Sequence, residues 1–432
     1  MSEPSQAKTD ASRAGLRNYV LVTAAYWSDT VTDGATRMLV LFYFYNLGYS
    51  PFAVASLFIF YEVFGILTNL FGGYIGARFG LKTTLFIGLG TQLVALSMLA
   101  FAPQSLLVVA WVMASQALSG IAKDMTKMSS KSAVKLIVPE NASDTLYRWV
   151  AILTGSKNAL KGVGFFLGGL LLTMLDFQTA LKLLVVLVGV TLMLAALLMR
   201  GGLGQANKKA KFSHVFSHNA SVNKLAAARI FLFGARDVWF VVGLPVFLRS
   251  VLDWSFWQAG GFLAVWVIGY GIVQAATPRL LRSRVDEQHE PDGRTATVLA
   301  FVLAALPAGI ALALSAGVAP AIVVVAGLIV FGVVFALNSA VHSYLILAYT
   351  DSDKVAMNVG FYYMANAAGR LAGTVLSGAL YQWGLQSGPS NGLVACLWAS
   401  SAFVLVAGLL SLLLPRNPGP RSKPIKMGDL GD

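Results

Sequence analysis

The sequence predicts an all-α polytopic membrane protein of twelve transmembrane helices, built as two pseudo-symmetric halves of six. Three observations predict it. The 432 residues are 57% hydrophobic and only 12% charged, which is roughly half the charged share of an average soluble domain. Apolar stretches of about 20 residues, each able to cross a bilayer as a helix, follow one another along the chain. The alternating pattern of a membrane β-barrel is absent.

The twelve expected spans are divided into two sets by one long polar loop, rich in lysine and histidine, at 200–221. We therefore expect a first half over 17–199 and a second over 222–414, with polar tails at 1–16 and 415–432. The first tail has no apolar core followed by a cleavage site, so it is not expected to be a signal peptide. The spans are expected at 17–46, 51–77, 83–103, 106–128, 146–175, 179–199, 222–250, 255–280, 295–317, 319–349, 354–383 and 393–414.

Basic residues concentrate in alternate loops, and this fixes the expected orientation. The loops after even-numbered spans hold Arg78 and Lys82, Lys131 and Lys135, then Lys208, Lys209, Lys211, Arg282, Arg284 and Arg294. Cytoplasmic loops carry such an excess of lysine and arginine, so both termini are predicted to be cytoplasmic. The net charge of +13 follows this loop pattern, and it therefore does not indicate nucleic-acid binding.

An internal repeat supports the two halves. The fifth span carries Asn158 and, about one turn later, Lys161, whereas the eleventh carries Asn366 and then Arg370. In both spans a stripe of small residues follows, made by Gly162, Gly164, Gly168 and Gly169 in one and Gly373 and Gly378 in the other. Two six-span halves with a site at their interface resemble the architecture of major facilitator transporters.

Charged residues recur inside the apolar spans, where each costs a few kcal/mol unless it faces water or a partner. Asp29, Asp33 and Arg37 are spaced by four residues and share one face of the first span. They can form an internal salt bridge that lets the helix insert. Alternatively, Asp33 is a cavity carboxylate whose protonation is linked to substrate occupancy at Arg37.

Two lysines in the fifth span form a second candidate site. Lys157 and Lys161 are one turn apart and carry the same charge, so their repulsion requires an anion, a carboxylate or the loss of a proton. Glu62 in the second span is a possible partner, and a bound phosphate-like group would serve equally. The spacing favours a two-point cationic clamp.

A ladder of lysines at every fourth residue ends the fourth span, beginning with Lys123 and Lys127. These two lie deeper than Lys131 and Lys135, which are expected to be positive-inside residues. Lys123 and Lys127 are therefore interpreted as a funnel that draws anions from the cytosol. Asp124 neutralises one of them.

The second half contributes Arg236 in the seventh span and Arg370 in the eleventh. A guanidinium is effectively always charged and pairs bidentately with phosphate or carboxylate. Arg236 is the leading candidate, with Arg37 as its counterpart in the first half. Asp237 is adjacent to Arg236, so the two are expected to point to different faces of the helix and to pair poorly. Because most intramembrane charges are basic, the predicted cargo is an anion.

Several kinds of site are not expected from this sequence. The single cysteine, Cys396, excludes a disulfide framework and a multi-thiolate metal site. A phosphate-binding loop for ATP is absent. No nucleophile–base arrangement supports an embedded enzyme, and no stretch is long enough for the soluble domain of a sensor. We therefore expect no cofactor, no metal, no enzymatic activity and a monomer.

The segment Gly73-Tyr-Ile-Gly-Ala-Arg78-Phe-Gly80-Leu-Lys82 resembles the loop signature of the major facilitator family. Ala77 stands where that signature usually has an aspartate, and this removes one member of the charge relay that latches the cytoplasmic gate. The resemblance implies a gate loop at these positions.

More specific stretches resemble the ArsJ-type organoarsenical efflux permeases, and the resemblance covers essentially all twelve spans. The stretches are Ala117-Leu-Ser-Gly-Ile-Ala-Lys-Asp124 with Lys127-Met-Ser-Ser-Lys131, then 147–166, and 232–240. The resemblance implies export of 1-arseno-3-phosphoglycerate across the bacterial cytoplasmic membrane. A glyceraldehyde-3-phosphate dehydrogenase makes this ester from arsenate, and outside the cell the ester hydrolyses.

Other functions remain open at this point. Paired arginines also suit an organophosphate:phosphate antiporter. A proton-coupled small-molecule exporter is the second alternative, although many intramembrane cations disfavour the cationic cargo common in that class. Coupling is expected through proton antiport at Asp33 or Glu62, through phosphate exchange, or through facilitated diffusion.

Overall fold

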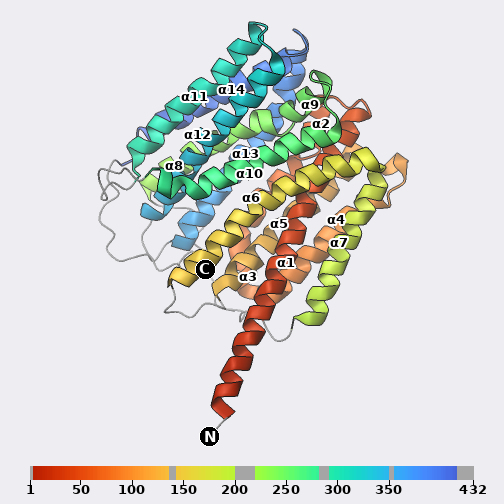
Figure 1. The fold of residues 1–432 in the computed structure, drawn as a ribbon, viewed down its shortest axis with the longest axis vertical. Helices are drawn as coiled ribbons and strands as arrows, with labels where there is room; N and C mark the ends of the chain where they lie inside the picture. The colour runs from red at the N-terminus through yellow and green to blue at the C-terminus, as the bar shows by residue number, and fades with distance from the viewer. Residues whose placement is uncertain (1–2, 136–142, 200–218, 282–290, 350–354, 416–432) are drawn as a thin grey trace.

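The computed structural model describes residues 3–135, 143–199, 219–281, 291–349 and 355–415 (Figure 1). Within these ranges, side chains are described except at 3–16, 70, 72–79, 131–135, 143–155, 278–279, 347 and 355–360. All regular secondary structure in the described residues is helical.

Among its described residues, the first half contains seven α-helices and a short 3₁₀ turn, η1 (Gln104–Leu106). The helices are α1 (Glu3–Asn46), α2 (Pro51–Ser56), α3 (Ile59–Phe79), α4 (Leu81–Ala100), α5 (Val109–Lys135), α6 (Ser143–Met174) and α7 (Phe177–Leu198). Helix α1 begins well before the expected start of the first span. The second and third helices together occupy the place of the second expected span.

The second half contains another seven helices among its described residues. They are α8 (Ala220–Phe240), α9 (Gly243–Ser250), α10 (Phe256–Leu280), α11 (Gly293–Ser315), α12 (Pro320–Ala348), α13 (Val355–Leu385) and α14 (Asn391–Ser411). Helices α8 and α9 share the place of the seventh expected span. Each of the twelve expected spans therefore coincides with a helix or with a helix broken once.

Eight helical stretches in the described residues are long and apolar enough to cross a membrane: α2 with α3, α4, α7, α8 with α9, α10, α11, α12 and α14. The other four long helices are α1, α5, α6 and α13. These hold Asp33, Lys123, Lys161 and Arg370, and charged side chains lower the hydropathy of a helix. Four of the spans that carry the candidate site therefore fall outside this apolar set.

The break between α8 and α9 has a local cause. Pro245 has no backbone N–H, and its ring would clash with the carbonyl group of Val241 in a continuous helix. The backbone N–H groups of Val242 and Gly243 instead donate to the Ser377 hydroxyl at 3.1 Å and 3.0 Å. Helix α13 therefore satisfies the donors that the break releases.

The glycine stripe predicted in the fifth span lets α6 pack closely against two helices at once. A Cβ on Gly168 would lie 2.4 Å from the carbonyl oxygen of Ala35 in α1, and one on Gly169 would lie 2.4 Å from that of Phe256 in α10. Small residues allow such backbone approach in membranes. Helix α6 thereby joins its own half to the other half.

Helix α13 has the equivalent position in the second half. A Cβ on Gly373 would lie 2.7 Å from the carbonyl oxygen of Gly234 in α8, and one on Gly378 would lie 2.4 Å from the Cβ of Ala55 in α2. Each half thus places its fifth span between its own first span and the opposite half. This is the pseudo-symmetry that the repeat predicts.

Aromatic packing holds α8 behind the site. The buried indole of Trp239 lies edge-on to Trp266 of α10, with ring centroids 5.5 Å apart, and to Phe331 of α12 at 5.2 Å. Such pairs contribute about 0.5–1.5 kcal/mol each beyond burial. They fix the helix that carries Arg236 and Asp237.

Candidate functional site: an ionic network between the halves

The first carboxylate of the site, Asp33 on α1, is contacted from two other helices. The Tyr61 hydroxyl on α3 donates to Asp33 Oδ1 at 2.6 Å, and Lys161 Nζ on α6 lies 3.6 Å from Oδ2. Lys123 Nζ on α5 lies 4.0 Å from the centre of the Tyr61 ring. Four helices of the first half therefore meet at Asp33 and Tyr61.

The second carboxylate, Glu62 on α3, connects the two halves. Arg370 Nη2 on α13 donates to Glu62 Oε1 at 2.7 Å, and Arg37 Nη1 on α1 lies 3.4 Å from the same oxygen. The Arg37 guanidinium also lies over the ring of Phe58, 5.0 Å from its centre. One carboxylate oxygen is thus shared by an arginine from each half.

The third carboxylate, Asp237 on α8, corrects an expectation. Arg236 pairs with Asp237, with Nε at 2.6 Å and Nη2 at 2.5 Å from Oδ1. Adjacent Cβ atoms do diverge on a helix, but the long arginine side chain curves back to the carboxylate. Arg370 Nε lies 3.4 Å from Asp237 Oδ2, so Asp237 also joins the network.

The pairing pattern repeats between the halves. Asp33 on the first span pairs with Lys161 on the fifth, and Asp237 on the seventh pairs with Arg370 on the eleventh. The i,i+4 arrangement of the first span does not act as an internal pair, because Asp33 contacts Lys161 and Tyr61 while Arg37 contacts Glu62. Glu62 is the partner of arginines rather than of the lysine clamp.

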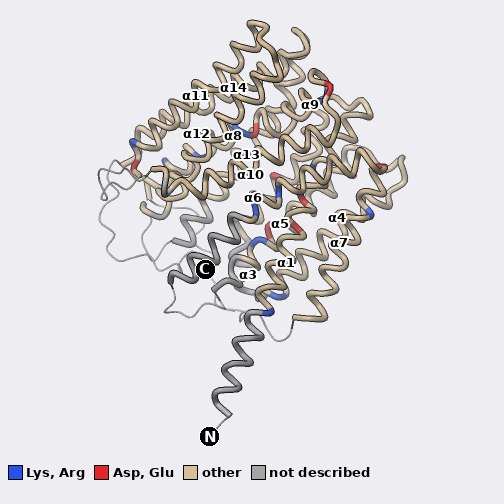
Figure 2. Tube along the Cα trace, in the orientation of Figure 1, with Lys and Arg blue, Asp and Glu red and all other residues tan. Residues whose placement is uncertain are grey.

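The network is richer in positive than in negative charge, and its cations are the more accessible members. The side chains of Lys161, Arg370 and Arg236 are 21%, 20% and 16% exposed, whereas their carboxylate partners are 2–6% exposed. Figure 2 shows basic and acidic positions inside the bundle, near the labels of α5, α6 and α8. Three carboxylates are shared by Arg37, Lys161, Arg236 and Arg370, and Lys123 lies beside them over the ring of Tyr61.

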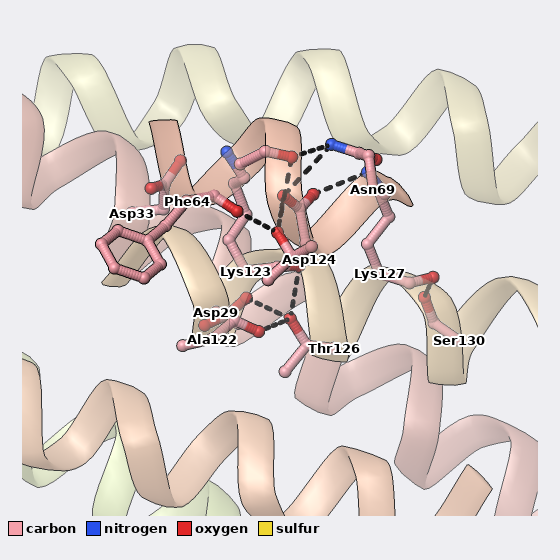
Figure 3. A network of polar contacts seen from close by, with 12 residues as sticks. Asp29, Asp33, Phe64, Asn69, Ala122, Lys123, Asp124, Thr126, Lys127 and Ser130 are labelled. Atoms are coloured by element: carbon pink, nitrogen blue, oxygen red, sulfur yellow. Dashed lines mark hydrogen bonds and ion pairs between the residues drawn. The ribbon is translucent and has the colours of Figure 1, made fainter. Parts of the chain in front are cut away.

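Lys127 belongs to a separate polar cluster between α3 and α5 (Figure 3). Its Nζ lies 2.6 Å from Asp124 Oδ1 and 2.7 Å from the side-chain oxygen of Asn69. Asp124 also accepts from Thr68 at 2.9 Å. Asp124 neutralises one member of the lysine ladder, as expected, and that member is Lys127.

Asp29 faces α5 as well. The Thr126 hydroxyl donates to Asp29 Oδ2 at 2.5 Å (Figure 3). This contact places Asp29 one turn away from the ionic network on the same helix. Lys157 lies on α6, one turn before Lys161, and is half-buried.

Of the expected gate loop, Gly73 and Arg78 lie in α3 among residues whose side chains are outside the description. Gly80 connects α3 to α4 with φ at 80°, a conformation that favours glycine. Lys82 Nζ donates to the carbonyl oxygen of Met199 at 2.9 Å, which ties the loop to the end of α7.

Tyr61 is the site residue that the sequence reasoning missed. It contacts Asp33, and its ring lies beside Lys123 and Arg37. A tyrosine in an apolar span is usually read as an interfacial residue. Its position directly before Glu62 was the one available signal.

The profile of the family described as Major Facilitator Superfamily matches residues 22–346. Among curated proteins, none matches the chain. A solved proton-dependent oligopeptide transporter has a TM-score of 0.70 at 13% identity, covering 92% of this chain and 97% of its own. The nucleoside transporter NupG has a TM-score of 0.67 at 13% identity, and the match covers 93% of this chain and 99% of that one. A POT family transporter in complex with 5-aminolevulinic acid has a TM-score of 0.67 at 13% identity, and the match covers 92% of this chain and 95% of that one.

Proposed function

This chain belongs to the major facilitator superfamily and is a multi-pass membrane transporter, and from that premise we propose that it exports an organic phosphate-like anion, specifically 1-arseno-3-phosphoglycerate. Transport proceeds by rocking of the two halves around the ionic network. The proposed membrane is the bacterial cytoplasmic membrane. The proposed functional partner is a glyceraldehyde-3-phosphate dehydrogenase that supplies the ester from arsenate without contacting the transporter.

The surplus of cations in the network is the observation that carries the proposal. Lys161, Arg236 and Arg370 are partly accessible, yet they lie inside the helical bundle of a membrane transporter. An intramembrane charge marks a substrate or ion pathway. A phosphate ester with an arsenate group carries several negative charges, and guanidinium groups bind such oxyanions bidentately.

Glu62 supplies the step that couples binding to movement in this proposal. It lies where a substrate oxyanion would contact Arg37 and Arg370, which come from opposite halves. An arriving dianion displaces the Glu62 carboxylate and takes its place between Arg37 and Arg370. Arg370 keeps Asp237 and Arg37 keeps the Phe58 ring, so both remain positioned.

The test is arsenic accumulation in arsenate-challenged cells that express the chain with and without the dehydrogenase, in a host lacking its own enzyme. We expect accumulation to fall only when both proteins are present. A fall without the dehydrogenase would indicate a simpler anion. No fall in either strain would favour the organophosphate:phosphate antiporter, which the arginine pair at Glu62 also suits.

Two variants locate the site within the same assay. Lys161→Ala and Arg236→Ala are expected to abolish export because each removes an accessible cation of the network. Lys182→Ala is the matched control, since Lys182 is exposed on α7 beside Phe101, away from the network. Membrane levels are compared by immunoblot. Normal export by both network variants would contradict a basic substrate site.

A further inference from the structure

A second buried arginine lies outside the ionic network. Arg229 on α8 is 4% exposed, and its Nη1 donates to the carbonyl oxygen of Ser339 on α12 at 3.2 Å. Its guanidinium lies 3.8 Å from the ring centre of Phe233 and 4.9 Å from that of Tyr362. In the part of the chain that the structure describes, no carboxylate oxygen lies within 4.0 Å of it, and its buried Nε makes no hydrogen bond.

Among the described residues, this arrangement leaves a buried positive charge with no carboxylate in contact. Guanidinium cannot be deprotonated in a protein, and an uncompensated buried charge costs several kcal/mol. Two aromatic rings offset only part of that cost, since a desolvated cation–π contact contributes about 2 kcal/mol. Among the described residues, Arg37 is the other buried cation, and a Glu62 carboxylate oxygen lies 3.4 Å from its Nη1.

Two buried polar side chains on α12 lack hydrogen-bond partners in the described structure. His342 on α12 is fully buried and lies within electrostatic reach of Arg229, and neither of its ring nitrogens has a hydrogen-bond partner in the described structure. Asn338 lies one turn earlier on α12, is also fully buried, and its amide nitrogen and oxygen have no partner there either. Residues spaced by four share one face of a helix.

Such a group of unsatisfied buried atoms is rare in a native protein, where the large majority are hydrogen-bonded. What the three residues have in common is that each offers an N–H: a guanidinium, an imidazole and an amide. What they lack is a negative acceptor. We propose that Arg229, His342 and Asn338 bind a small inorganic monoanion, for which chloride is the test case.

The charge of the site selects the class of ligand. One guanidinium balances one negative charge, and a neutral imidazole and an amide add donors without adding charge. Arg229 and Arg236 both lie over the ring of Phe233, at 3.8 Å and 5.0 Å, so the site adjoins the ionic network but shares none of its carboxylates. The inference does not depend on which substrate the network carries.

Bromide is the probe, because its anomalous scattering reports position directly. The purified full chain is crystallised in sodium bromide, and thermal unfolding is followed in chloride or gluconate at equal ionic strength. We expect an anomalous peak in contact with the Arg229 guanidinium and a higher melting temperature in chloride. Arg229→Gln should remove both effects, whereas Arg249→Gln, at the other end of the same span, should retain both.

A second variant covers the case in which Arg229→Gln fails to fold. His342→Phe keeps the charge but removes a donor, and it should weaken the chloride dependence at least several-fold. No peak at Arg229 together with equal stability in both salts overturns the proposal, as does a chloride effect that both site variants retain. Loss of the bromide peak on adding 3-phosphoglycerate would mean that a substrate group shares the site, and persistence would mean a separate anion. Either result supports anion binding at Arg229.

Discussion

At the scale of single residues, Glu62 has the most consequential position. Its Oε1 is shared by Arg370 of one half and Arg37 of the other. A monocarboxylate ligand that displaced Glu62 would replace one carboxylate by another and gain no charge. Its binding would be unfavourable because the free ligand loses translational freedom, which the attached side chain does not. A phosphate dianion brings twice the charge and can bind both arginines. In the proposed mechanism, Glu62 would therefore favour a cargo with at least two negative charges over one with a single negative charge.

The first prediction follows from this competition. Glu62→Gln removes the competing charge, so the purified variant should bind 3-phosphoglycerate about tenfold more tightly than the unmodified chain, equal to about 1.4 kcal/mol. It should also bind glycerate, which lacks the phosphate group. Isothermal titration measures both ligands, and thermal unfolding verifies the fold.

Asp33→Asn is the matched control for this prediction. Asp33 is also a buried carboxylate paired with a cation, but it contacts Lys161 within its own half. We expect it to leave the preference for 3-phosphoglycerate over glycerate unchanged. Equal or weaker binding by Glu62→Gln would show that Glu62 does not compete with the anion.

The identities of the charged residues could be predicted from the sequence, but their pairing could not. Intramembrane charges stand out in an apolar chain, and Asp33, Arg37, Lys161, Arg236 and Arg370 were found in this way. Pairing depends on side-chain rotamers and on which helices become neighbours. For that reason Asp237 was wrongly judged a poor partner for Arg236, and the sequence reasoning overlooked Tyr61.

At the scale of helices, glycine positions determine how closely α6 approaches its neighbours. Gly168 faces the backbone of α1, whereas Gly309 on α11 has open space where a Cβ would lie. The same substitution therefore tests packing against propensity. Alanine is a better helix former than glycine by about 1 kcal/mol. A Gly→Ala substitution in a helix therefore destabilises the protein only where the new Cβ is crowded.

We expect Gly168→Ala to destabilise the protein by about 1–3 kcal/mol, the cost typical of overpacking. Gly309→Ala should be neutral or slightly stabilising. Thermal unfolding in detergent measures both variants. Equal melting temperatures for the two variants would contradict close packing of α6 against α1.

The start of α7 provides a pH-dependent prediction outside the membrane-spanning residues. The Asp176 side chain caps α7 by accepting from the backbone N–H groups of Thr179 at 3.0 Å and Gln178 at 3.1 Å. Hydrogen bonds from Thr179 lower the pKa of this exposed carboxyl below its usual range. A lowered folded-state pKa means that the cap contributes stability above the unfolded value of about 3.9 and loses it as the pH falls through the folded value.

Asp176→Ala should therefore cost about 1 kcal/mol at pH 7, and less below the pKa of the folded state. Asp176→Asn retains a capping side chain and should keep most of the stability, with no pH dependence from this position. Unfolding is compared at pH 7 and pH 3. A pH-independent cost of the alanine variant would rule out a charged cap.

The helix boundaries were largely predictable, and the two interruptions were not. The twelve spans could be predicted because the length and apolar composition of a stretch are enough to identify a membrane-spanning helix. The break before α9 has a signal in Pro245, but Pro307 lies inside α11 without breaking it. Whether a proline interrupts a helix depends on partners such as Ser377, which lies over 130 residues away.

At the scale of the whole molecule, the halves contact each other where α1 ends and α2 begins. The backbone N–H of Phe52 on α2 donates to the side chain of Gln382 on α13 at 3.2 Å, and Phe42 on α1 lies 5.4 Å from Phe256 on α10. The distribution of basic loops predicts that this end faces away from the cytoplasm. The proposed export would require these contacts to separate.

A reversible cross-link tests that requirement. Phe52→Cys with Gln382→Cys, in a Cys396→Ala background, is treated with a short thiol-specific cross-linker carrying a disulfide. We expect transport in vesicles to stop and to recover on reduction. Phe101→Cys with Lys182→Cys, a pair within the first half, should transport equally well when cross-linked.

The shared carboxylate also bears on how the membrane voltage acts on the carrier. Each unbalanced positive charge that moves outward against an inside-negative potential costs about 2.3 kcal/mol per 100 mV. With Glu62 beside Arg37 and Arg370, the empty carrier moves one positive charge fewer than its arginines alone would. The proposed dianionic cargo, in contrast, would be driven outward by the same potential. In the proposed cycle, the membrane potential would therefore favour the outward passage of the cargo, and it would oppose the movement of the empty carrier less than it would if Glu62 were absent.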